Sequence, residues 1–79
     1  MKITVEEAIE HLKEGGEVTV EAEGYSYEIS QSENWVGGDA EEGYISSVLG
    51  NVIYDDARYV IEKTIKWLSS DGAEVVLSV

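Results

Sequence analysis

The stretch that decides the fold is residues 17–30, EVTVEAEGYSYEIS. Apolar and polar residues alternate along it on both sides of Glu23-Gly24, which suits a two-residue hairpin turn. Alternation with a period of two is typical of strands whose successive side chains point to opposite faces of a sheet. The turn then aligns three core-facing pairs: Ala22 with Tyr25, Val20 with Tyr27, and Val18 with Ile29.

The other face of this hairpin carries the polar residues. No two carboxylates are directly opposite each other on it, and directly opposed like charges would destabilise the strand pair. The sequence therefore predicts a hairpin with one apolar face and one acidic face. The polar pairs are Glu21 with Ser26, Thr19 with Glu28, and Glu17 with Ser30.

A helix is predicted before the hairpin. Thr4 and Glu7 have the spacing of a capping box, in which each residue bonds the backbone N–H of the other. Gly15-Gly16 indicates where the helix ends. The apolar residues in between recur at helical spacing: Val5, Ala8, Ile9 and Leu12.

A second helix and a last strand are predicted in the C-terminal half. Asp55 or Asp56 is placed to cap the helix, and residues 73–79 have the pattern of a strand. The helix carries one apolar stripe for the core: Ala57, Val60, Ile61, Thr64, Ile65 and Leu68.

Two segments between these elements are less regular. Residues 31–43 are polar and glycine-rich, which predicts a loop. Residues 44–54 fit a helix face, but Gly50-Asn51 also suits the turn of a second hairpin. Both interpretations of residues 44–54 stay open.

These elements predict a single α/β (α+β) domain over residues 1–79. A small, mostly antiparallel sheet of about three strands packs against two or three helices, in the order α-β-β-(α)-α-β. The expected inward set is Val18, Val20, Tyr27, Ile29, Val60, Ile61, Ile65, Leu68, Val75 and Leu77.

The charge of the chain is strongly negative and unevenly distributed. Seventeen acidic and five basic side chains give a formal net charge of −12. Residues 1–42 hold twelve of the acidic and two of the basic side chains. This sign excludes direct binding to nucleic acid or to an anionic membrane. No apolar stretch approaches the ~20 residues of a membrane span.

The sequence offers no strong signal for catalysis. There is no Cys, and the one His, His11, is expected to be a solvated helix side chain. The carboxylate pairs Glu41-Glu42 and Asp55-Asp56 suit solvated loops and helix caps. We therefore expect no catalytic residue, no metal site and no cofactor. A chain without Cys and without the apolar run of a signal peptide is expected in the cytoplasm.

The aromatic residues are all Tyr or Trp, the types enriched at interfaces. Tyr25, Tyr27 and Trp67 suit half-buried positions over a small core. Trp35 stands in the acidic, glycine-rich segment 31–43, and two interpretations of it stay open. It either anchors a partner protein or pins this segment to the core.

The acidic face is the main candidate for a binding site. Carboxylates at alternate strand positions are ~6.8 Å apart and form a regular row of negative charge that can mimic nucleic-acid phosphates. Such a surface fits a basic protein as partner, with the chain as a monomer or a small homo-oligomer. Solubility and halophilic adaptation remain the simpler interpretations of the acidity. The expected partner-binding residues are Glu17, Glu21, Glu23, Glu28, Glu33, Trp35, Asp39, Glu41 and Glu42.

Length, acidity, absence of Cys and the α/β pattern together resemble small acidic phage-encoded counter-defence proteins, above all anti-CRISPR proteins. The opening EEAIEHLKEGGEV, residues 6–18, is similar to the helix-then-strand start of many small phage proteins. The resemblance implies a non-enzymatic inhibitor that occupies a basic, nucleic-acid-handling surface of a CRISPR effector complex in the host cytoplasm. The alternative is an immunity protein that neutralises a basic nuclease toxin.

Overall fold

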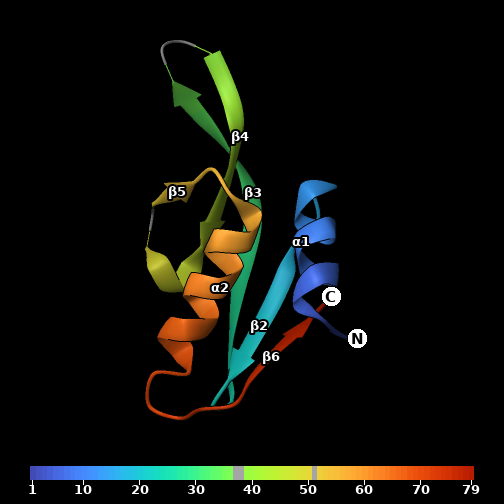
Figure 1. The fold of residues 1–79 in the computed structure, drawn as a ribbon, viewed down its shortest axis with the longest axis vertical. Coiled ribbons are helices and arrows are strands. Elements are labelled where there is room, and N and C mark those ends of the chain that lie inside the picture. Colours follow the sequence, from blue (N-terminus) through green and yellow to red (C-terminus); the bar gives the residue numbers. More distant parts are fainter. Residues whose placement is uncertain (37–38, 51) are drawn as a thin grey trace.

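In the computed structural model, the backbone is described for residues 1–36, 39–50 and 52–79, and the side chains for residues 1–32, 43–50 and 52–79. Over these residues the chain forms one six-stranded sheet with two α-helices on one face (Figure 1). Neighbouring strands of the described chain are antiparallel, in the order β1-β6-β2-β3-β4-β5. The strands are β1 (Lys2–Ile3), β2 (Val18–Ala22), β3 (Tyr25–Val36), β4 (Asp39–Ser46), β5 (Ile53–Tyr54) and β6 (Val75–Ser78). The helices are α1 (Val5–Lys13), α2 (Ala57–Leu68) and the short 3₁₀ helix η1 (Ser47–Leu49).

The central hairpin, β2–β3, has the predicted register. Val18 pairs with Ile29, Val20 with Tyr27 and Ala22 with Tyr25. Glu23 and Gly24 have φ angles of 52° and 83°, and positive φ at both central residues is what a two-residue hairpin turn of type I′ requires. The strand β2 begins at Val18, so the expected pair of Glu17 with Ser30 is not part of this register.

The two helices begin where the sequence predicted. The Thr4 hydroxyl accepts the Glu7 N–H at 3.2 Å, and the Glu7 carboxylate accepts the Thr4 N–H at 3.0 Å. Asp56 caps α2 by accepting the Arg58 N–H at 3.0 Å. These contacts satisfy backbone donors that a helix leaves free in its first turn.

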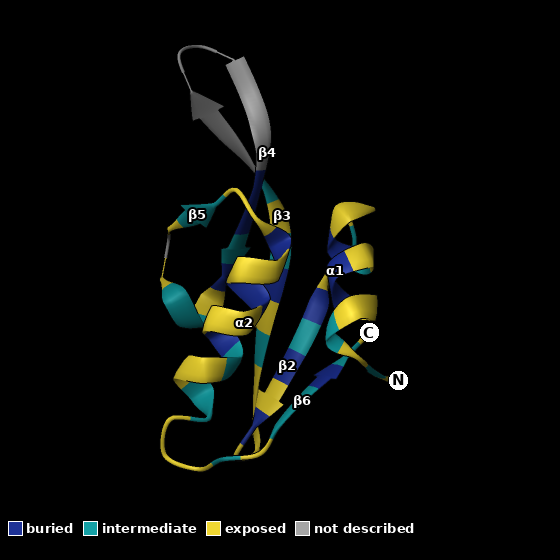
Figure 2. Ribbon diagram, in the orientation of Figure 1, coloured by how far each residue is buried: buried dark blue, intermediate teal, exposed yellow. Residues whose placement is uncertain are grey.

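The core lies between the two helices and one face of the sheet (Figure 2). The whole predicted inward set is buried or half-buried. The Thr64 hydroxyl lies 2.9 Å from Ser46 Oγ and 2.7 Å from the Val60 carbonyl oxygen, which ties α2 to the end of β4. The largest apolar side chains of the core are less than 2% exposed. They are Leu12, Ile29, Ile61, Val18, Val20 and Val60.

The α+β class is as predicted, but the prediction of about three strands is too low and the predicted order α-β-β-(α)-α-β is wrong, because the observed order is β1-α1-β2-β3-β4-η1-β5-α2-β6. The strands β1 and β5 have two residues each, too short for a periodic pattern to show. The remaining differences lie in residues 31–36 and 39–43, where the expected loop is wrong. β3 runs on to Val36 and pairs with β4, with Val36 opposite Asp39. This segment has polar residues at successive positions, so its sequence lacks the alternation of apolar and polar residues by which a strand is recognised.

The helix interpretation of residues 44–54 is also wrong. Tyr44 and Ile45 end β4 and pair with Tyr54 and Ile53 of β5, so the hairpin interpretation is closer. Between the strands the chain makes the short helix η1, and Gly50 follows with a φ of 77°. The other proposed turn residue, Asn51, lies outside the described residues.

Two aromatic side chains are much more exposed than expected. Tyr25 is 67% exposed and Trp67 is 66% exposed. Tyr25 has the predicted pairing with Ala22, but this is the last residue pair before the turn and lies at the end of the hairpin. Tyr27 is half-buried, as expected. No helix of the described chain is long and apolar enough to cross a membrane.

Candidate functional site

The face of the sheet turned away from α1 and α2 is the candidate site, and we call it the open face. Its strands carry polar residues at the positions that alternate with the core. One row across the sheet joins Lys2, Ser78, Thr19 and Glu28, and the next joins Val76, Glu21 and Ser26. No helix of the described chain covers this face (Figure 1).

Glu21 and Glu28 are the two carboxylates on the β2–β3 part of the open face. Both are exposed. They lie diagonally, because Glu21 pairs with Ser26 and Glu28 pairs with Thr19. Diagonal neighbours on antiparallel strands are ~7–8 Å apart, so the two charges are close without being opposed.

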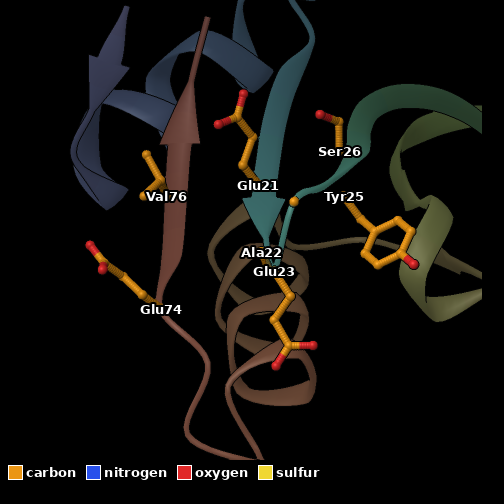
Figure 3. A pocket seen from close by; sticks show the side chains of 8 residues that line it. Glu21, Ala22, Glu23, Tyr25, Ser26, Glu74 and Val76 are labelled. Carbon is orange, nitrogen blue, oxygen red and sulfur yellow. The ribbon is translucent and has the colours of Figure 1, made fainter.

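A hollow of about 500 Å³ lies at the turn end of this face. Its acidic side chains are Glu21, Glu23 and Glu74, and Tyr25 and Val76 also line it. Figure 3 shows the three carboxylates spread around the hollow rather than converging on one point. This arrangement suits several separate cationic groups of a partner, because no single cation could contact all three carboxylates.

A smaller hollow of about 310 Å³ lies further along the open face. It is lined by Glu28, Ser30, Ile45, Ser47 and Gly50. Here the Glu28 N–H donates to Ser47 Oγ at 3.1 Å, so η1 folds back against β3. Glu21 lines the first hollow and Glu28 lines the second, and both side chains are exposed to the solvent.

The structure brings together only part of the predicted site. Glu21 and Glu28 share the open face, Glu23 is in the turn, and Glu17 is exposed just before β2. The remaining expected residues belong to the outer part of β3 and β4, where Glu33 pairs with Glu42, and their side chains lie outside the described residues. These are Glu33, Trp35, Asp39, Glu41 and Glu42, so the alternatives for Trp35 stay open.

Glu74 is the residue that the sequence analysis missed. The strand containing it was predicted, but local alternation does not reveal which strand it pairs with. β6 lies beside β2, with Val75 opposite Ala22, so Glu74 comes to the turn end of β2. The signal would have been the central apolar pattern of residues 75–77, which is typical of an interior strand.

The His11 side chain is half-buried and is not the solvated group we expected. Its ring lies against Gly16, where a Cβ atom would collide with the imidazole. Glycine at position 16 therefore gives room for the ring. Among the described residues, no group of three His, Cys, Asp or Glu side chains could hold a metal ion.

The cations of the protein are concentrated on α2. Arg58 forms a salt bridge with Glu6 at 2.6 Å, and this hydrogen bond raises the Arg58 pKa above its ordinary value. Lys63 donates to the Tyr59 hydroxyl at 3.2 Å, a hydrogen bond that raises the Lys63 pKa. Because both cations are exposed, these contacts contribute little to stability.

No family model, curated protein or solved structure matches this chain.

Proposed function

We propose that this protein is a non-enzymatic inhibitor that binds a basic, nucleic-acid-handling surface of a CRISPR effector complex in the host cytoplasm. It competes there with the nucleic acid by presenting carboxylates where phosphates would bind. The choice of a CRISPR effector rests on the resemblance of the whole chain to small acidic counter-defence proteins. The choice of a basic partner rests on the disposition of the charges.

One observation carries the proposal. Every acidic side chain in the described part of the chain is exposed, and only Glu6 among them forms a salt bridge. A folded domain with this many uncompensated charges repels itself, which opposes compaction. The same charges attract a basic surface over a Debye length of ~8 Å at physiological ionic strength and displace its counterions.

The open face supports the choice of contact surface. It is built on paired strands whose other face is core, so its carboxylates are held on a rigid scaffold. Thr19, Ser26 and Ser30 separate the acids with short side chains that can donate and accept hydrogen bonds. Short polar neighbours let a flat basic surface approach closely, while Glu21 and Glu28 supply the charge.

Competition with DNA tests the proposal. A fluorescent target DNA is bound to the purified effector complex, and increasing amounts of the inhibitor are added while anisotropy is followed. We expect the wild type to displace the DNA. The triple variant Glu17→Lys, Glu21→Lys, Glu28→Lys should displace it at least about tenfold less well, because it reverses the charge of the contact surface.

A charge-matched control distinguishes the effect of changing the open face from the effect of changing the net charge. Glu10→Lys, Glu14→Lys, Asp71→Lys makes the same change in net charge at exposed positions away from the open face. It should inhibit much better than the open-face variant. Equal inhibition by both variants would contradict the assignment of the surface. Tight binding to one small basic nuclease, with none to the effector complex, would contradict the proposed partner.

A further inference from the structure

The outward side of α2 differs from the rest of the protein. Residues 57–70 hold three basic side chains and one acidic one, a net charge of +2. The remaining residues, with two basic and sixteen acidic side chains, carry −14. Like-charged copies of this chain therefore repel each other least where two α2 helices meet.

This side of α2 also exposes two aromatic side chains around a hollow. Tyr59 is 49% exposed and Trp67 is 66% exposed, and exposed yellow segments mark the outward turns of the helix in Figure 2. Together with Glu62, Lys63, Lys66 and Ser70 they line a hollow of about 590 Å³, and we call these six residues the α2 stripe. Exposed Tyr and Trp side chains with a cationic rim are typical of an interaction surface.

Lys63 is held within its own chain. Its ammonium nitrogen lies 5.4 Å from the centre of the Tyr59 ring and 5.8 Å from that of Tyr54, and these two rings are 5.4 Å apart. It also donates to the Tyr59 hydroxyl. Lys63 therefore holds the exposed Tyr59 ring in place, while Glu62 and Lys66 form no salt bridge within the described chain.

We propose that the α2 stripe is a homodimer interface, in which the α2 helices of two copies pack antiparallel. When the helices cross between positions 63 and 64, positions 59 and 67 lie within about one residue of each other along the two helix axes, as do positions 62 and 66. Tyr59 then packs on Trp67 of the second copy, and Glu62 pairs with Lys66 of the second copy. The twofold symmetry makes each contact twice, as a self-complementary interface requires.

The dimer keeps both open faces accessible. α2 lies on the covered side of the sheet, so the two sheets point outward and the two helix layers form the interior of the assembly (Figure 1). The inference does not depend on the proposed function. One helix face is smaller than a standard interface of roughly 800 Å² per partner, so we expect a weak dimer with a Kd on the order of 100 μM.

Sedimentation velocity of the full chain from about 10 μM to about 1 mM tests the dimer. We expect a concentration-dependent equilibrium between monomer and dimer. Trp67→Ala should raise the dimer Kd at least about tenfold, because two such side chains are lost per dimer. Tyr25→Ala removes an equally exposed aromatic outside the stripe and should leave the Kd within about twofold. Unchanged melting temperatures confirm that both variants fold.

A charge exchange tests the geometry. Glu62→Lys and Lys66→Glu should each be more monomeric than wild type, because each replaces two ion pairs with like charges. A mixture of the two variants should form a heterodimer, because the lysine introduced into one chain then meets the glutamate introduced into the other. Failure of the mixture to associate overturns the antiparallel arrangement, and a wild type that is monomeric at about 1 mM overturns the dimer.

Salt separates this interface from the proposed inhibitor contact. Screening reduces the repulsion between two acidic chains, so the dimer should tighten as NaCl rises from about 50 to about 500 mM. The complex with a basic partner should weaken over the same range. A dimer that weakens with salt contradicts an interface between like-charged chains.

Discussion

The two faces of the β2–β3 hairpin show how one pair of strands serves two purposes. Val20 and Glu21 are neighbours in sequence, yet Val20 has no exposure and Glu21 is exposed. On the covered face, side-chain volume determines whether the protein folds, because the helices pack directly on it. On the open face neither α1 nor α2 packs on the side chains (Figure 1). Substitutions on the two faces should therefore affect different properties, stability on one and binding on the other.

The largest expected effect is a loss of stability on the covered face. Ile29 has no exposed surface, and Ile29→Ala leaves a cavity between α1, α2 and the sheet. We expect the free energy of unfolding to fall by about 3 kcal/mol. Denaturation in urea measures it. Glu28→Ala, on the same strand but on the open face, should change it by only about 0.5 kcal/mol. Similar losses in both variants would contradict the distinction between the faces.

Trp35→Ala separates the two interpretations of that residue. As an anchor in the interface, Trp35 should contribute about 2 kcal/mol to binding, so affinity falls about thirtyfold while the melting temperature holds. As a pin, it should lower the melting temperature and leave the binding of the folded molecules intact. Calorimetry and binding titrations on the same sample decide between the two.

A smaller effect is expected at the turn that fixes the register of the two faces. Gly24 has a φ of 83°, and nothing lies within 4 Å of the position of an added Cβ atom. Gly24→Ala should therefore cost about 1 kcal/mol through backbone strain alone, without a steric clash. Denaturation measures the loss. Inhibition by the folded variant should be unchanged, and a loss of inhibition would indicate that the register itself had slipped.

The sequence predicted the elements that have a covered face. The alternation in residues 18–29 and the stripe from Ala57 to Leu68 exist because helices and sheet bury one side of each. The outer ends of β3 and β4 extend beyond the helices (Figure 1), and the polar residues 31–34 show no apolar–polar alternation in the sequence. The exposure of Tyr25 was missed for a related reason. Alternation predicts which face of the sheet a side chain points to, but it does not predict how far along the strand the helices cover that face.

The candidate site was predictable only where it depends on local pairing. Glu21 and Glu28 follow from the register of a two-residue turn. Glu74 joins Glu21 through the pairing of β6 with β2, which brings together residues more than fifty positions apart. The apolar residues 75–77 indicate an interior strand, but no local pattern in the sequence specifies β2 as its neighbour. The α2 stripe was missed for a different reason, because Trp67 was expected at a half-buried position over the core and is 66% exposed.

The central claim is that exposed acidic side chains attract a basic partner, and the association rate tests it most directly. Stopped-flow mixing of the inhibitor with the purified effector complex measures this rate from about 50 to about 500 mM NaCl. Long-range attraction accelerates encounter and is screened by salt, so the rate should fall at least about tenfold over this range. An association rate that does not change with salt would contradict the account.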